Sequence, residues 1–175
     1  MSGAQPAIDF AEFVAARSPV LLRAAWLLTG DQGKAEDLLQ TALAHVWPRW
    51  SRVVEGGSPE AFVRRVLYTT YLSWWRRRWR FEEPFADLPE HSDTVDVAGE
   101  QATRDAVRRA LGRLSRQQRA VVVLRYVEDL SVAETAVVLS CSTGTVKVQS
   151  SRALAVLRGD GALRFAVRAD EEVGV

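Results

Sequence analysis

Apolar residues recur with helical spacing along most of this chain, and no stretch alternates with a period of two for long enough to predict a strand. The first amphipathic segment runs from Phe10 to Leu28 and ends at residues 29–31. Pro19 lies inside this segment, where it could kink the helix or divide it in two. The pattern predicts an all-α fold that begins with a long helix, whole or divided.

A second and a third helix are expected in the amino-terminal half. The second runs from about Gly33 to Trp47, and Pro48 stops it. The segment Val53–Pro59 is expected to be a loop, because it contains two glycines and ends in proline. The third helix starts at Pro59, with an acid near the positive end of the helix dipole, and continues to Arg80.

The third helix is basic and aromatic at once. Between residues 60 and 82 the chain carries six arginines and no acid. Arginine interleaved with Trp and Tyr can hold phosphates and stack on unpaired bases. The alternative is a helix whose tryptophans, Trp74 among them, only complete a small core, with arginines that keep the surface soluble.

An acidic stretch separates the two halves. Residues 81–102 carry seven acids and no Lys or Arg, and residues 82–100 lack helical periodicity, which is typical of a flexible linker. Helical patterns resume at Gln101–Leu114 and, after the capping residue Ser115, at Arg116–Tyr126. We therefore predict two small helical domains, 8–81 and 101–158, a linker at 82–100 and a short tail at 159–175.

Two short helical patterns joined by a tight polar turn occupy residues 130–158. Ser131 and Glu134 form an S-x-x-E capping box that starts the first helix. Ala136 is small where the two helices must cross, residues 140–142 make the turn, and Ser142 can cap the second helix. This is the layout of a helix-turn-helix DNA reader, with an ordinary helical hairpin as the alternative.

The second helix of this pair has an apolar face and a polar face. The residues expected to face inward recur at helical spacing and are Val146, Ser150, Ala153, Leu154 and Leu157. The opposite face combines a small residue, cations and short side chains, which suits phosphates and base edges; it carries Gly144, Lys147, Val148, Ser151, Arg152 and Ala155.

Composition excludes several other classes of protein. The net charge of the 175 residues is only +1, but the basic and acidic stretches are separated, so the total conceals a basic surface. The single cysteine, Cys141, excludes an internal disulfide, and neither it nor His45 and His91 predict a metal site or a catalytic group. No secretion signal and no membrane span are apparent. We expect a cytoplasmic protein without cofactor or catalytic residues.

With both halves considered together, the chain resembles the extracytoplasmic-function sigma factors, the promoter-reading subunits of bacterial RNA polymerase. The resemblance covers roughly residues 8–158. It rests on AEDLLQTALAHVW at 35–47, which is similar to the family's polymerase-binding helix, and on LSRQQR, RYVEDLS and GTVK in the carboxy-terminal half, which are similar to its fourth region. The tandem-Trp, Arg-rich third helix is similar to the sigma-E-like subgroup found in actinobacteria.

The resemblance implies partners and the residues that contact them. Core RNA polymerase is the first partner, bound through the clamp helices of its largest subunit and the flap of the second largest. The clamp-helix contacts correspond to Asp37, Gln40, Thr41 and Trp47, and the family often has an acid where this chain has Thr41. Further implied partners are promoter DNA and an anti-sigma factor, and we expect the free chain to be a monomer.

The resemblance also implies two DNA-reading surfaces. The loop 52–58 corresponds to one that captures a base flipped from the minus-ten element, which requires a preformed pocket because extrusion costs stacking energy. The minus-ten contacts correspond to Arg52, Arg65, Thr69, Ser73, Trp74, Arg76, Arg77 and Arg80, and the minus-thirty-five contacts to Thr143, Gly144, Thr145, Lys147, Val148, Gln149, Ser151 and Arg152. Thr69, Ser73, Val148 and Ser140 depart from the family's usual residues.

Two other functions remain as alternatives. A stand-alone helix-turn-helix regulator would have an amino-terminal dimerisation or sensing domain and would bind a palindromic site as a homodimer. An enzyme or a protein-interaction module on a helical scaffold is the second, although no nucleophile with a partner base, metal cluster or phosphate loop supports an enzyme.

Overall fold

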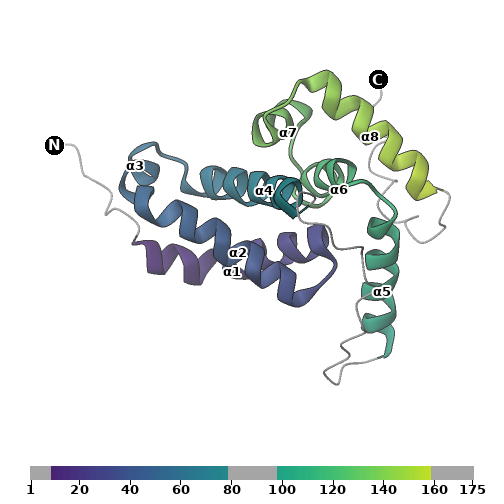
Figure 1. Ribbon diagram of the computed structural model, residues 1–175, viewed down its shortest axis with the longest axis horizontal. Helices are drawn as coiled ribbons and strands as arrows, with labels where there is room; N and C mark the ends of the chain where they lie inside the picture. Colours follow the sequence, from purple (N-terminus) through teal and green to yellow (C-terminus); the bar gives the residue numbers. More distant parts are fainter. Residues whose placement is uncertain (1–8, 79–97, 159–175) are drawn as a thin grey trace.

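The computed structural model describes residues 9–78 and 98–158, and every element assigned within these ranges is a helix. The all-α prediction is therefore confirmed. Figure 1 shows two groups of helices side by side, α1 to α4 and α5 to α8. No described helix is long and apolar enough to cross a membrane.

The first group is a bundle of α1 (Phe10–Thr29), α2 (Gln32–Val46) and α4 (Pro59–Arg78). Gly30 ends α1 with a φ of 71°, and Asp31 begins α2 by accepting a hydrogen bond from the backbone of Lys34 at 2.8 Å. Gly30 suits this junction because a residue with a Cβ would be strained at positive φ. The core of the bundle is made of apolar side chains from all three helices, among them Phe13, Leu28, Leu38, Val46, Leu67 and Tyr71.

Pro19 neither divides nor ends α1, which is continuous over its 20 residues. A proline inside a helix removes one backbone hydrogen bond and leaves the carbonyl four residues earlier without its donor. Here that carbonyl belongs to Ala15, and both residues lie on the exposed side of the helix. Water can therefore solvate the freed carbonyl, which lets the packing of the opposite face hold the helix together.

The predicted loop Val53–Pro59 is wrong in its first part. After a short 3₁₀ turn, η1 (Trp47–Arg49), the chain forms a further helix, α3 (Trp50–Glu55). Val53 is buried, and the ring of Trp50 lies 5.0 Å from that of Phe13. The breakers Gly56 and Gly57 correctly end the helix, but they gave no sign of the packing that forms it.

The second group contains α5 (Ala98–Gly112), α6 (Arg116–Val122), α7 (Val132–Leu139) and α8 (Thr143–Arg158). Helix α5 begins at Ala98, earlier than the predicted Gln101. Ser115 begins α6 with a capping box, as its position suggested, and α6 passes directly into a π-helical turn, η2 (Val123–Val127). The core of this group is apolar and includes Leu111, Val121, Leu124, Val138, Val146 and Leu157.

The two groups pack against each other. The buried apolar residues of both form one continuous cluster, and α4 contacts α7 directly. Arg119 of α6 donates a hydrogen bond to the backbone carbonyl of Leu28 at 2.8 Å. This carbonyl belongs to the last turn of α1, where the helix has no backbone donor of its own to offer. The carboxy-terminal group thus caps a helix of the amino-terminal group.

Candidate nucleic-acid interface

The helix-turn-helix has the local structure that its sequence predicts. The Ser131 side chain accepts from the backbone of Glu134 at 3.1 Å, and the Glu134 carboxylate accepts from the backbone of Ser131 at 2.8 Å. These hydrogen bonds lower the pKa of Glu134. Ser142 begins α8 by accepting from the backbone of Thr145 at 3.1 Å. Both helix starts are therefore fixed by side chains, as such residues allow.

The turn between α7 and α8 contains a strained residue. Ser140 has a φ of 52°, in the left-handed region that disfavours residues with a Cβ. The resemblance had marked Ser140 as standing where glycine is usual, and the structure shows that glycine would suit this backbone. The chain nevertheless keeps a serine, whose hydroxyl accepts a hydrogen bond from Arg65 at 3.2 Å.

Helix α8 presents the predicted polar face to solvent. Val146, Ala153 and Leu157 are buried, as expected for the inward face. The outward residues Thr143, Gly144, Lys147, Val148, Ser151 and Arg152 are exposed. Thr145 and Gln149 are half-buried, and the Thr145 hydroxyl lies 2.9 Å from that of Ser142. The helix thus offers two cations, small side chains and an apolar contact on one accessible face, which is what a major-groove reader needs.

Helix α4 carries most of the predicted minus-ten residues that lie in the described part of the chain. Arg65 is exposed, and Thr69 and Ser73 are half-buried. The hydroxyl of Thr69 donates to the Arg65 carbonyl at 2.8 Å and that of Ser73 to the Thr70 carbonyl at 3.0 Å. Both oxygens keep lone pairs with which to accept from a base.

The remaining predicted minus-ten residues differ in position. Trp74 is half-buried and packs against the core, and Arg52 is exposed on α3 rather than on a loop. The backbones of Arg76 and Arg77 belong to α4, but their side chains lie outside the described residues, as does the whole of Arg80. The linker 82–100 and the tail 159–175 lie outside them too, apart from residues 98–100, which begin α5.

The predicted polymerase-binding residues form a third surface, on α2 and the turn that follows it. Asp37 and Gln40 are exposed, and Thr41 donates its hydroxyl proton to the Asp37 carbonyl at 2.7 Å. Trp47 is 60% exposed, although its ring lies 4.9 Å from that of Phe10. An acid, an amide and a large aromatic are thus exposed on α2 and the turn after it, and such groups can contact a protein partner.

Sequence reasoning missed one group of polar residues. Glu128, in the turn after η2, accepts hydrogen bonds from Arg64 and Tyr68 of α4. Burial raises the pKa of Tyr68, and the neighbouring Glu128 carboxylate adds to the rise. The motif RYVEDLS contains Glu128 and the basic helix contains Arg64, but nothing in the sequence pairs residues that lie 64 positions apart.

Within residues 9–78 and 98–158, no group of three or more His, Cys, Asp and Glu side chains could hold a metal ion. Cys141 is half-buried, and burial raises the pKa of its thiol, which leaves it poorly suited to act as a nucleophile.

Two known families match separate segments of the chain. The family described as sigma-70 region 2 matches residues 13–81, and the family described as sigma-70 region 4 matches residues 104–157. A stand-alone helix-turn-helix regulator does not account for the first of these matches. Helix α4 lies in the first matched segment and α8 in the second.

Similar proteins cover most of the chain. An RNA polymerase sigma-E factor of Streptomyces coelicolor is 43% identical over 86% of this chain and 85% of its own length. The ECF RNA polymerase sigma factor SigL of Mycobacterium tuberculosis is 32% identical over 79% of this chain and 81% of its own. The solved sigma factor RpoE of Bartonella quintana, in complex with the anti-sigma factor NepR, is 27% identical with a TM-score of 0.66, over 90% of this chain and 98% of that one.

Proposed function

The chain belongs to the extracytoplasmic-function sigma factors of bacterial RNA polymerase, and we propose which of its surfaces bind the polymerase, the minus-ten element and the minus-thirty-five element. A member of this family binds core RNA polymerase and directs promoter-specific initiation of transcription. The observation that carries the assignment is the presence of both sigma regions in one chain.

The minus-thirty-five element is read by the exposed face of α8. Lys147 and Arg152 are placed to contact phosphates or guanine edges, and Val148 offers an apolar surface to a thymine methyl group. Gly144 is exposed near the start of α8 and carries no side chain, so the DNA backbone can approach the helix start closely. The remaining contacts come from Thr143, Thr145, Gln149 and Ser151.

The minus-ten element is read by α4 and by the turn that follows α3. Arg65, Thr69 and Ser73 supply a cation and two hydroxyls on adjacent turns of α4, and Trp74, Arg76, Arg77 and Arg80 complete the proposed set. A flipped base is received beside Arg52, at the end of α3, and binding this base in its extruded form favours the melted duplex. Strand opening thus follows from binding, and RNA synthesis itself is left to the core enzyme.

Core polymerase binds the α2 surface made by Asp37, Gln40, Thr41 and Trp47. The acid at Asp37 supplies a charge to a partner helix, and the exposed ring of Trp47 supplies apolar contact area. The chain acts in the cytoplasm with its polymerase. An anti-sigma factor is a further proposed partner, because a solved relative is in complex with one.

The test is run-off transcription with purified core polymerase on a genomic library, with and without this chain. We expect transcripts that depend on the chain and that share two promoter elements at fixed spacing. The absence of any chain-dependent transcript would contradict the function. A nanomolar, sequence-specific complex with promoter duplex in the absence of core would instead favour a stand-alone regulator.

A further inference from the structure

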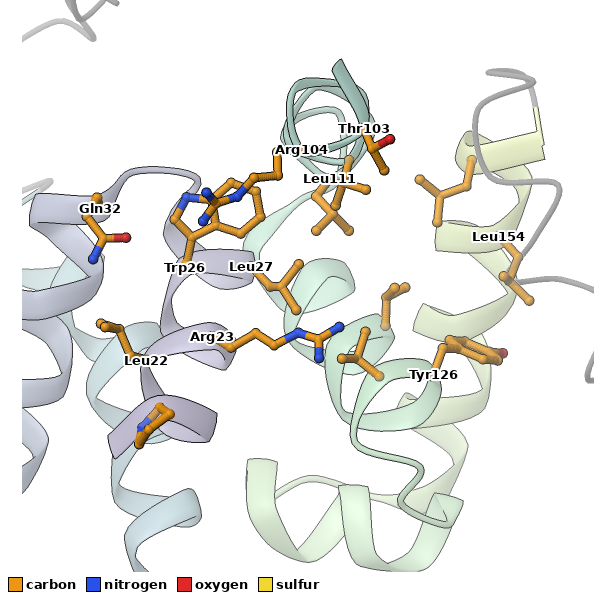
Figure 2. Close-up of a pocket in the computed structure, with 15 residues that line it drawn as sticks. Leu22, Arg23, Trp26, Leu27, Gln32, Thr103, Arg104, Leu111, Tyr126 and Leu154 are labelled. Carbon is orange, nitrogen blue, oxygen red and sulfur yellow. The ribbon is translucent and has the colours of Figure 1, made fainter. Parts of the chain in front are cut away.

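A cavity of about 620 Å³ lies where α1 faces α5 and α8. Helix α1 forms one wall, and residues of α5, α6, η2 and α8 form the others. Figure 2 shows Leu22 and Trp26 on the α1 side of this space and Tyr126 and Leu154 on the opposite side. Pockets that bind small molecules typically hold about 300–1,000 Å³, whereas domain interiors contain few voids larger than a water molecule. The cavity therefore has the size of a ligand site.

This cavity is separate from the surfaces assigned above. Among the described residues that line it, none belongs to the sets that we assign to core polymerase, the minus-ten element or the minus-thirty-five element. Helix α8 contributes Leu154 and Leu157, which lie on its inward side and away from Lys147 and Arg152. Promoter reading and polymerase binding thus leave the cavity without a role.

The depth of the cavity is apolar. Leu27 of α1, Leu111 of α5 and Val122 of α6 are buried and line it. The half-buried ring of Trp26 adds an aromatic surface to the same wall. Such a lining gains free energy when hydrocarbon replaces water, and a polar group placed there would lose its hydrogen bonds to water. The depth therefore favours a hydrocarbon chain.

The charge at the rim has one sign. The described lining residues include two arginines, Arg23 of α1 and Arg104 of α5, and no acid. Both arginines are exposed, and they belong to opposite walls. Figure 2 shows the Arg23 side chain extending from α1 into the cavity. A guanidinium group binds a carboxylate through paired, charge-assisted hydrogen bonds. The rim therefore favours an anionic group.

Arg104 is held in place by an aromatic ring. Its guanidinium carbon lies over the Trp26 ring, 5.3 Å from the ring centroid. A guanidinium that stacks through its face keeps its N–H edge available to an acceptor, and the stack restricts its orientation. Less conformational entropy is then lost when an anion binds. The stack thus places a cation beside the apolar depth.

We propose that this cavity binds a small amphipathic carboxylate of the medium-chain fatty acid class. The hydrocarbon chain occupies the depth beside Leu27, Leu111 and Val122. The carboxylate lies at the rim, where it pairs with Arg104 and is attracted by Arg23. This site does not depend on the proposed assignment of the promoter-reading and polymerase-binding surfaces.

The test is isothermal titration calorimetry of the full chain with decanoate, kept below the concentration at which decanoate forms micelles. We expect saturable binding at one site. Decanol carries the same chain without the charge, and we expect it to bind about tenfold more weakly, because it lacks a charge-assisted hydrogen bond. Decylamine carries the opposite charge and should not bind measurably.

Substitutions distinguish the rim from the depth. Arg104→Gln should weaken decanoate binding about tenfold and leave decanol binding unchanged, because only the carboxylate pairs with the guanidinium. Arg109→Gln is the matched control, since Arg109 is an exposed arginine of the same helix that does not line the cavity. Leu154→Trp fills part of the depth and should weaken binding of decanoate and decanol alike.

Several results would overturn the proposal. These are decanoate binding that does not saturate, decanol or decylamine binding as tightly as decanoate, and equal effects of Arg104→Gln and Arg109→Gln. Circular dichroism identifies any variant that has lost its fold. Arg104→Gln, at an exposed position, decides the matter if Leu154→Trp does not fold.

Two other occupants of the cavity would also overturn it. Residues 159–175 follow α8 in the sequence and include the apolar Phe165. Tighter decanoate binding by Phe165→Asp would assign the cavity to this segment of the chain. A dimer that Leu154→Trp dissociates, measured by sedimentation equilibrium, would assign it to a second copy. Because neither polymerase nor DNA is present in these measurements, a failure of the run-off test would leave their result unaffected.

Discussion

The two helices that we propose to read the promoter differ in their surroundings. On α8, the predicted DNA-facing residues Lys147, Val148 and Arg152 are exposed, and the inward face packs within the same group of helices. On α4, Arg65 is held by Ser140, and its neighbours Arg64 and Tyr68 are held by Glu128. The proposed DNA-facing residues are therefore accessible on α8, whereas on α4 Arg65 is bonded to the other group of helices.

With Arg65 bonded to Ser140, the proposed reading face of α4 is less accessible than that of α8. We expect substitutions to affect polymerase binding most, DNA binding next, and the stability of the fold least.

We expect the largest effect from Asp37→Arg, because it disrupts the proposed contact with core polymerase, on which promoter binding by both α4 and α8 depends. Reversing a charge in a protein interface is expected to cost about 3 kcal/mol or more of core-binding free energy. Asp37 is exposed, so the fold should survive. Binding to purified core, measured by fluorescence anisotropy of the labelled chain, should fall at least about a hundredfold.

Glu12→Arg is the control for that variant, because Glu12 is an exposed acid on α1, away from the α2 surface. It should bind core normally. Equal binding by the two variants would show that the α2 surface does not contact the polymerase. The polymerase would then hold α4 and α8 through some other surface.

Lys147→Ala should weaken DNA binding by α8 and leave DNA binding by α4 unchanged. Loss of one contact from a recognition helix is expected to cost about 1–3 kcal/mol of binding free energy. We expect transcription from a promoter with both elements to fall by about five- to 150-fold. Binding of the minus-ten strand and the radius of gyration should not change. Arg158→Ala, an exposed cation at the end of the same helix, should have little effect. A change in the radius of gyration caused by Lys147→Ala would mean that α8 and α4 influence each other.

Ser140→Gly and Ser140→Ala distinguish two effects at the turn between α7 and α8: the strain of the positive φ and the hydrogen bond to Arg65 of α4. Both remove the hydroxyl that accepts a hydrogen bond from Arg65, and both should weaken the contact between the two groups of helices to the same small extent. Only glycine relieves the positive φ, which costs a residue with a Cβ about 1–2 kcal/mol. Ser140→Gly should therefore exceed Ser140→Ala by about 1 kcal/mol in unfolding free energy, measured by urea denaturation. Equal stabilities would contradict a strained Ser140.

The smallest effect is expected at Thr135, inside the carboxy-terminal group. Its hydroxyl is buried and has no hydrogen-bond partner among the described residues. Replacing an unsatisfied buried polar atom with a methyl group is neutral or stabilising, by up to about 1 kcal/mol. We expect Thr135→Val to raise the unfolding free energy slightly and to leave DNA binding unchanged.

Thr29→Val is the contrasting variant, because the Thr29 hydroxyl donates to the Ala25 carbonyl at 2.8 Å at the end of α1. It should lower stability where Thr135→Val raises it. Loss of stability in both would indicate that Thr135 has a partner in solution that satisfies its hydroxyl.

Local features of the fold followed from local sequence. The capping box of Ser131 and Glu134, the cap at Ser142 and the stop at Gly30 each depend on residues a few positions apart, and each formed as predicted. The inward and outward faces of α8 also followed, because a helical period is set by the backbone alone. An error arose where packing overrode local signals, at the buried Val53 of α3, and packing also decided that α1 stays whole at Pro19.

The sequence alone predicted the all-α class, the two groups of helices, the helix-turn-helix and a family resemblance that the comparisons confirm. The tertiary structure alone decided that the groups touch, that Glu128 meets Arg64 and Tyr68, and that Ser140 holds Arg65. The reason is physical. Helical period and capping act over a few residues, whereas the partners of Glu128 lie 60 and 64 positions away and are brought to it only by folding.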